Sequence, residues 1–134
     1  MNAKTLEALD TIRSGMSAAA YRAALGGSAM PPMQYDTAVP DDPIPFQEFA
    51  GLGIAVVFSR DGNKVDSVEF GPEFAGAING IAIGMTGVEV EQRLGPCDRT
   101  WPMPHPNYVL IYDRPEYLRI DLSRTDERVI TMYR

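Results

Sequence analysis

Apolar residues at helical spacing open this chain of 134 residues. Near the start they recur every three or four residues, at Leu6, Leu9, Ile12 and Met16. This spacing predicts an amphipathic helix over residues 4–14, which Gly15 ends. Ser17 is a typical N-cap residue, so we expect a second, shorter helix over about residues 18–25.

Apolar and β-branched residues, in part alternating with polar ones, predict strands in both halves of the chain. The expected strands cover residues 54–58, 64–70, 108–112, 118–122 and 129–133. Asp61-Gly62-Asn63 has the composition of a hairpin turn between the first two strands. Proline-rich stretches over residues 37–50 and 100–107 are expected to be loops. Helices followed by antiparallel meanders make this an α+β chain.

One pattern occurs twice, 69 residues apart. Gly-Met-Ser/Thr, seven further residues and Leu-Gly occupy residues 15–26 and again residues 84–95. In the second copy, Thr86 and Glu89 have the spacing of a capping box. Further matches pair Phe58-Ser59-Arg60 with Leu122-Ser123-Arg124, and Tyr35-Asp36 with Tyr112-Asp113. A repeat of this length indicates two copies of one supersecondary unit.

The predicted fold is therefore a single domain, residues 1–134, made of two tandem helix-helix-β-meander repeats. They cover about residues 5–70 and 74–134. Together they are expected to form one antiparallel sheet with helices on one face, which leaves the other face open.

Charge and composition narrow the functional classes. The net charge is −6, mostly from residues 1–77, which hold five Lys and Arg against ten Asp and Glu. No basic stripe of the kind that binds nucleic acid is present. No apolar run reaches the roughly 20 residues of a membrane span, and the N-terminus lacks the apolar core of a secretory signal. The single cysteine, Cys97, allows no internal disulfide, and we expect an inert thiol in a cytoplasmic protein.

The motif Gly-Met-Thr-x-x-x-Val-x-x-x-Leu-Gly-Pro of residues 84–96, followed by a meander, resembles the repeat of the beta-lactamase inhibitory protein fold. The small outer-membrane assembly lipoproteins of the BamE type are similar, but two tandem copies look more like the inhibitor. This resemblance implies that the open sheet face and its loops grip a partner protein. In size, charge and fold the chain is also similar to bacterial immunity proteins, which bind and occlude a cognate toxin.

The expected partner-binding residues come from the two loops and the open sheet face. The acidic, aromatic loop over residues 37–50 contributes Asp41, Asp42, Phe46, Glu48 and Phe49. The second loop and the strands beside it contribute Trp101, His105, Tyr108, Tyr117, Arg119 and Asp121. Aromatic and Arg residues often dominate interface energies, and proline-stiffened loops lose little entropy on docking. The acid excess predicts a basic partner.

No pattern of residues predicts catalysis. His105, the only histidine, lies between two prolines without an orienting carboxylate nearby in sequence, and no His, Asp and Glu cluster has metal-ligand spacing. No phosphate-binding glycine loop is present, so we expect neither a cofactor nor a metal. Two alternatives stay open: an assembly factor that binds a peptide strand at a sheet edge, and a protein that binds a small molecule in the concave sheet.

Overall fold

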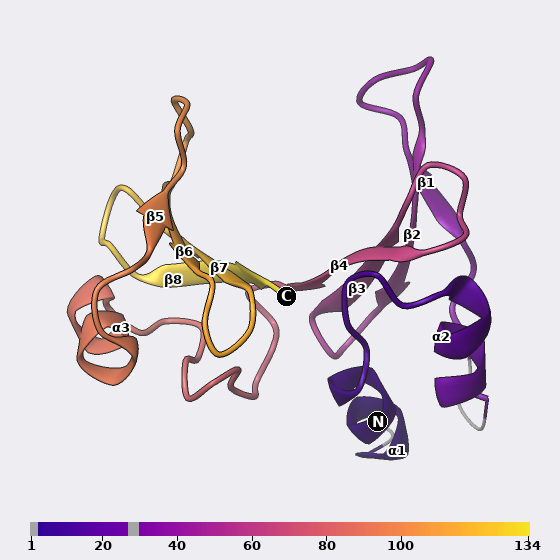
Figure 1. Cartoon of the computed structure of the whole chain (residues 1–134), viewed down its shortest axis with the longest axis horizontal. Coiled ribbons are helices and arrows are strands. Elements are labelled where there is room, and N and C mark those ends of the chain that lie inside the picture. The colour runs from indigo at the N-terminus through magenta and orange to yellow at the C-terminus, as the bar shows by residue number, and fades with distance from the viewer. Residues whose placement is uncertain (1–2, 27–29) are drawn as a thin grey trace. The chain divides into compact units, whose positions relative to one another are not determined.

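The computed structural model of this chain describes residues 3–26 and 30–134, and its fold is α+β (Figure 1). The described residues form three short helices and one eight-stranded antiparallel sheet. None of these helices is long and apolar enough to span a bilayer. The chain divides into two compact units, Met1–Glu69 (unit one) and Phe70–Arg134 (unit two).

Unit one has two helices before its strands. These elements are α1 (Ala3–Asp10), α2 (Ala18–Ala24), β1 (Gln34–Asp36), β2 (Ile44–Phe49), β3 (Ile54–Phe58) and β4 (Val65–Phe70), with strand order β1-β2-β3-β4. Tyr21 of α2 packs edge-on against Phe58 of β3, with ring centroids 5.1 Å apart. The Tyr21 hydroxyl also donates a 2.6 Å hydrogen bond to Gln47 Oε1 of β2. Gln47, Val56 and Phe58 therefore belong to the face that α2 covers.

Unit two has one helix before its strands. Its elements are α3 (Gly87–Leu94), β5 (Arg99–Thr100), β6 (Tyr108–Tyr112), β7 (Leu118–Leu122) and β8 (Val129–Tyr133), with strand order β8-β7-β6-β5. The predicted capping box of Thr86 and Glu89 is confirmed at the start of α3. Gly87 approaches β7 so closely that an added Cβ would lie 3.1 Å from Cδ1 of Leu122. Leu118, Ile120 and Leu122 are the buried residues of β7 on this helix-covered face.

Two sequence predictions about helices are wrong. The first helix ends at Asp10, because Thr11 and Ile12 already donate their N–H groups three residues back rather than four. A second helix was expected early in the second repeat, yet residues 71–82 contain none. A tight turn with positive φ at Asn79 and Gly80 replaces it, and Ile78 and Ile81 are still buried.

The predicted loop over residues 37–50 is also wrong in extent. Residues 44–49 form β2, which pairs with both β1 and β3, so the loop covers only residues 37–43. The prolines Pro43 and Pro45 suggested a loop, but Pro45 is tolerated within the strand and buried.

The same backbone hydrogen bonds tie the helix start to the last strand within each unit. In unit one they are Gly15 N–H to Val65 O (2.8 Å), Val65 N–H to Met16 O (2.8 Å) and Ala18 N–H to Asn63 O (2.8 Å). In unit two they are Gly84 N–H to Val129 O (2.8 Å), Val129 N–H to Met85 O (2.7 Å) and Gly87 N–H to Glu127 O (3.0 Å). Gly15 and Gly84 have φ of 89° and 92°.

Strand order and register allow the two units to be compared position by position, with β3 set beside β7. Val56 and Ile120 are the fully buried central residues of β3 and β7. Val56 pairs with Gln47, and Ile120 pairs with Leu110, so Gln47 and Leu110 correspond. In this comparison Tyr35-Asp36 and Tyr112-Asp113 do not fall at matching places, because the first pair lies in β1, whereas Tyr112 ends β6 and Asp113 follows it.

Candidate partner-binding site

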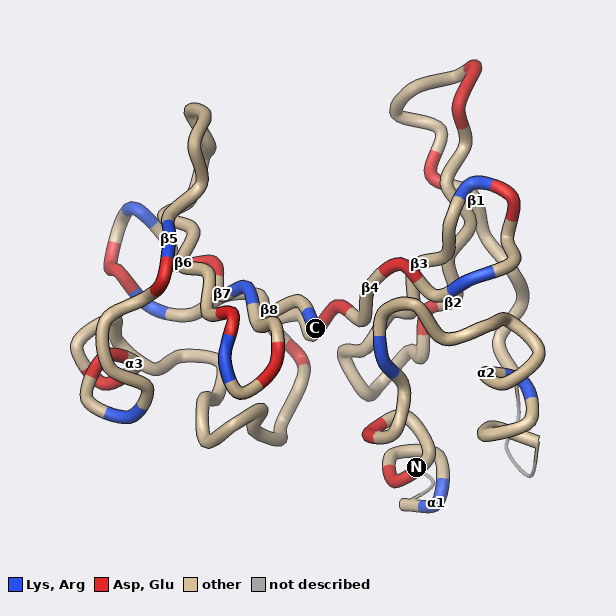
Figure 2. Tube along the Cα trace, viewed as in Figure 1, with Lys and Arg blue, Asp and Glu red and all other residues tan. Residues whose placement is uncertain are grey.

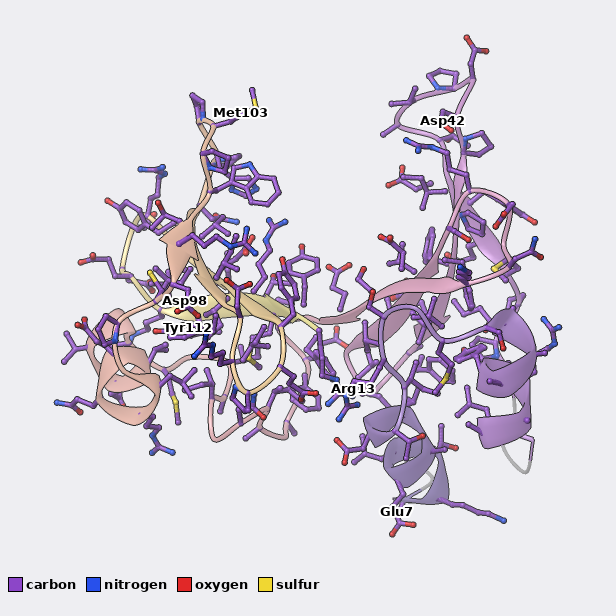
Figure 3. The ribbon with its side chains drawn as sticks, in the orientation of Figure 1. Glu7, Arg13, Asp42, Asp98, Met103 and Tyr112 are labelled. Carbon is purple, nitrogen blue, oxygen red and sulfur yellow. The ribbon has the colours of Figure 1, made fainter. Side chains whose placement is uncertain are left out.

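Five of the expected partner-binding residues lie in unit one. Asp41 and Asp42 lie in the loop over residues 37–43, where the trace in Figure 2 is coloured for acidic residues and Figure 3 labels Asp42. The Asp42 carboxylate is 2.6 Å from Arg60 Nε, whereas no ion pair of a described residue involves Asp41 or Glu48. Glu48 and the half-buried Phe46 lie on the face of β2 opposite α2. Phe49 is only 5% exposed, so its predicted role in partner contact is wrong.

Unit two brings four of the remaining residues together on the face of its strands opposite α3, called here the open face. Arg119 and Asp121 of β7 form a bidentate ion pair, with Nε to Oδ1 at 2.8 Å and Nη2 to Oδ2 at 2.9 Å. The side chain of Asp121 is 2% exposed and that of Arg119 is 17% exposed. Hydrogen bonding to Asp121 raises the pKa of the Arg119 guanidinium, which stays charged.

Two aromatic rings contact the Arg119 guanidinium. Its Cζ lies 4.7 Å from the centroid of the Trp101 ring and 4.5 Å from that of Tyr133, both within the range of cation–π attraction. Tyr133 pairs with Arg119 across the β7–β8 register. His105 Nε2 is 3.3 Å from Arg119 Nη2, and the His105 ring meets the Trp101 ring edge-on. Trp101, His105, Arg119, Asp121 and Tyr133 are called the Arg119 cluster.

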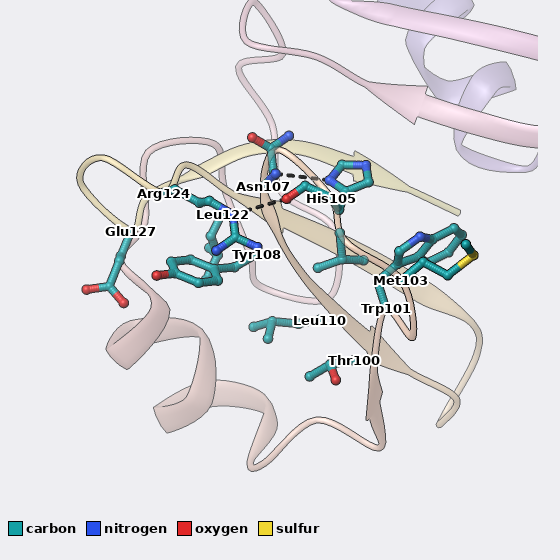
Figure 4. Close-up of a pocket in the computed structure, with 11 residues that line it drawn as sticks. Thr100, Trp101, Met103, His105, Asn107, Tyr108, Leu110, Leu122, Arg124 and Glu127 are labelled. Carbon is teal, nitrogen blue, oxygen red and sulfur yellow. Dashed lines mark hydrogen bonds between the residues drawn. The ribbon is translucent and has the colours of Figure 1, made fainter.

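The loop that carries Trp101 and His105 is held in place at its base. His105 Nδ1 accepts a 3.0 Å hydrogen bond from the Asn107 N–H, and the His105 carbonyl accepts one of 3.1 Å from Arg124 Nε (Figure 4). Prolines at positions 102, 104 and 106 restrict the backbone further. Met103, at the loop tip in Figure 3, is 69% exposed, and Trp101 is 40% exposed. The loop therefore presents apolar side chains from a restrained backbone.

Unit one carries no such cluster at the corresponding positions. Ala55 and Val57 of β3 correspond to Arg119 and Asp121, because Ile54 and Leu118 begin the matching strands. Both are half-buried. The same strand geometry is thus compatible with small apolar residues where unit two has a largely buried ion pair.

Two of the predicted residues in unit two are placed differently from the expectation, and two further residues contribute to the site. Asp121 was expected to face a partner, but it is buried and contacts Arg119. Tyr108 lies on the helix-side face of β6, because it pairs with Leu122, and Arg124 stacks over its ring at 4.4 Å. Tyr133 and Arg124 were not predicted at all. For Tyr133 the one available signal was its place in the last strand.

A pocket of about 410 Å³ adjoins the loop in unit two (Figure 4). Thr100, Tyr108, Leu110 and Leu122 line it from the helix-side face. The rest of its lining is Trp101, Met103, His105, Asn107, Val109, Arg124 and Glu127. This volume is within the range of small-ligand and side-chain pockets, and most of the lining is apolar.

The pKa shifts in this chain are caused by hydrogen bonds or by burial. Hydrogen bonds within a turn lower the pKa of Asp61, and the capping hydrogen bonds of Thr86 lower that of Glu89. Its hydrogen bonds with Arg99 lower the pKa of Asp113, and burial raises the pKa of Tyr21 and Tyr112. Among residues 3–26 and 30–134, no group of three His, Cys, Asp or Glu side chains could hold a metal ion.

Comparison of this chain with protein-family models, curated proteins and solved structures finds no match. The Arg119 cluster, the loop over residues 101–107 and the pocket are therefore the features of this chain that bear on its function.

Proposed function

We propose that this protein is a non-catalytic inhibitor that binds another protein through the open face of unit two. Trp101 and Met103 would make the central contact, and Arg119 would hold Trp101 in position. In its most specific form the proposal is a cytoplasmic immunity protein that occludes a cognate bacterial toxin.

The Arg119–Asp121 pair is the single observation that supports this proposal most. Removing two charges from water costs several kcal/mol per ion, and apolar residues of similar volume at such a site are often neutral or stabilising. Ala55 and Val57 occupy the corresponding positions of unit one without an ion pair. Since β3 forms with apolar residues at these positions, the presence of the pair in unit two favours a role in recognition.

The surroundings of the pair have the composition of a binding hot spot. Trp, Tyr and Arg are the residues that most often dominate interface energies, and Met is frequent at adaptable binding surfaces. Trp101 keeps 40% of its surface exposed although one of its faces contacts Arg119. A ring that is held in place before binding loses less side-chain entropy when a partner docks.

The tandem-repeat organisation is part of the same proposal. Matching hydrogen bonds at Gly15 and Gly84 and the shared order of one capped helix and four strands support two copies of one unit. In this interpretation unit one supplies a scaffold and an acidic loop, whereas unit two carries the recognition cluster. The likeness to two-repeat inhibitors and immunity proteins belongs to this proposal as well.

The acidic loop would steer a basic partner. Asp41 is exposed, and Glu48 adds a second exposed carboxylate on β2. Charge reversal to lysine at both positions should slow association and flatten its dependence on salt, because long-range attraction mainly sets the on-rate. An unchanged on-rate would remove the electrostatic part of the proposal and leave the Arg119 cluster untouched.

Affinity capture from the source cells tests the proposal as a whole. The bait would be the full chain, with Trp101→Ala as the test variant and Tyr35→Ala as the matched control, since Tyr35 is an exposed aromatic residue of unit one. We expect a stoichiometric partner that wild type and Tyr35→Ala retain and Trp101→Ala loses, and whose toxicity the wild-type chain suppresses. Capture that does not depend on Trp101 would contradict the proposed surface, and a partner without toxicity would contradict the immunity function.

A further inference from the structure

The pocket beside the loop in unit two, called here the loop pocket, contains an apolar residue at a place where unit one has a polar residue. Leu110 and Gln47 occupy corresponding places on the helix-side faces of β6 and β2. Gln47 is 7% exposed, whereas Leu110 is half-buried and lines the pocket. Folding alone favours the reverse, with the polar amide at the solvent-accessible position and the leucine at the covered one. The leucine at the accessible position therefore points to a function of this pocket.

In unit one the chain itself covers this position. The Gln47 amide donates a 2.8 Å hydrogen bond to the carbonyl of Pro31, and Gln47 Oε1 accepts the hydrogen bond from Tyr21. Pro31 and Pro32 lie just before β1, and proline residues hold such a segment in an extended conformation. The cover therefore consists of an extended segment and the long side chain of a helix residue.

In unit two neither part of this cover is present. Val90 occupies the place of Tyr21, since each lies four residues after its N-cap and donates its N–H to the carbonyl of that cap. Valine is too short to reach as far as the tyrosine hydroxyl does. The connection from α3 to β5 covers only residues 95–98, whereas α2 and β1 are separated by residues 25–33. The shorter connection has no segment equivalent to Pro31.

We infer that an extended, uncharged apolar segment of the partner protein occupies this pocket, in the place that the Pro31 segment takes in unit one. This inference rests on the proposed protein-binding function. Leu110 has no group that could bond a carbonyl, so the segment would contribute apolar side chains rather than the carbonyl contact of unit one. Tyr108, held by Arg124 over its ring, would form one wall of the pocket, and Met103 would adapt to the inserted side chain.

A peptide titration followed by amide chemical shifts tests this inference on the purified full chain. The probe is the hexapeptide Met-Pro-Pro-Met-Gln-Tyr, which copies residues 30–35. We expect saturable shifts at Thr100, Tyr108 and Leu110, with weak affinity typical of a short segment. Leu110→Ala should weaken the affinity about tenfold or more, because it removes the apolar wall without adding an amide of the kind that bonds Pro31 in unit one. Val39→Ala, at an exposed valine of unit one, is the matched control and should leave the affinity unchanged.

Three results would overturn the inference. The first is no saturable shift up to about 5 mM peptide, an affinity too weak for recognition. The second is concentration-dependent shifts of the same residues without peptide, which would assign the pocket to a second copy of the chain. The third is equal binding of methionine amide alone, which would assign it to a small molecule. Should Leu110→Ala fail to fold, Tyr108→Ala tests the same wall.

This experiment and the capture experiment can fail separately. The peptide titration probes the pocket through Leu110 on the helix-side face, whereas the capture experiment probes the whole chain and Trp101, which belongs to the Arg119 cluster and also lines the pocket. A captured toxin together with a silent peptide titration would therefore reject this inference and preserve the proposed function.

Discussion

Replacing the Arg119–Asp121 pair tests whether the ion pair is needed for folding. The perturbation is a cycle of three variants, Arg119→Met, Asp121→Val and the double variant with both changes. Methionine keeps most of the length of the arginine stem, and valine is the residue that unit one has at the corresponding position. Removing one partner of a buried pair leaves an uncompensated charge, whereas replacing both partners with apolar residues of similar size does not.

The burial of the two side chains sets the expected magnitudes. Arg119→Met leaves the carboxylate of Asp121, 2% exposed, without its cation and should cost about 3–5 kcal/mol of unfolding free energy. Asp121→Val should cost less, about 2 kcal/mol, because the arginine is 17% exposed and can turn its guanidinium toward water. The double variant should lie within about 1 kcal/mol of wild type. These values predict a large favourable coupling energy between the two positions.

Urea unfolding followed by far-ultraviolet circular dichroism measures these free energies. Trp101 fluorescence is unsuitable as the only probe, since the ring contacts Arg119 and reports on the cluster itself. A loss of about 3 kcal/mol would lower the urea midpoint by roughly 1–3 M. Thr131→Val, on the same face and outside the ion pair, is the control and should change stability by less than about 0.5 kcal/mol. A double variant as unstable as Arg119→Met would refute the reasoning, since the pair would then be required for folding.

Three further predictions concern the scaffold. Tyr21→Phe leaves the buried Gln47 acceptor without its hydrogen bond and should cost about 1–2 kcal/mol in urea unfolding, whereas adding Gln47→Leu should recover part of the loss. Gly15→Ala and Gly84→Ala should each cost about 1–2 kcal/mol through backbone strain alone, since both have positive φ with open space at the Cβ position, and clearly unequal losses would contradict the match between the units. The capping hydrogen bonds lower the pKa of Glu89, so their contribution is present at neutral pH and is lost as the pH falls through this lowered pKa. Stability measured against pH should therefore decline less in acid for Glu89→Gln than for wild type, and an identical acid decline would argue against this contribution.

The local elements of the fold were largely predictable from sequence. The capping box at Thr86 and Glu89 and the strand over residues 54–58 are confirmed. The prediction of a helix early in the second repeat was wrong, because a tight turn buries Phe74, Ile78 and Ile81 instead. The periodicity of apolar residues does not distinguish such a turn from a short helix. The prediction that Phe49 contacts a partner was wrong for a related reason. The neighbouring prolines suggested a loop, but Phe49 lies on the buried face of β2.

The residues of the candidate site were predictable only in part. Trp101, His105 and Arg119 stood out by type, and the structure brings them together in one cluster. Residue type alone did not show which of the predicted residues are accessible to a partner. Asp121 is buried and contacts Arg119, and Tyr108 lies on the helix-side face of β6. Tyr133 joins the cluster through the pairing of β7 with β8, a contact between residues 14 positions apart in the chain.

The sequence by itself determined where helices begin and where strands alternate, because caps, turns and side-chain periodicity depend on residues a few positions apart. Only the tertiary structure decided which side chains share a face, because a shift of one residue in register moves every side chain of a strand to the opposite face. Register placed Leu110 in an uncovered pocket, Gln47 under the Pro31 segment and Tyr133 beside Arg119, and the loop after β5 brought Trp101 to the same guanidinium. These cross-strand contacts carry the proposed function.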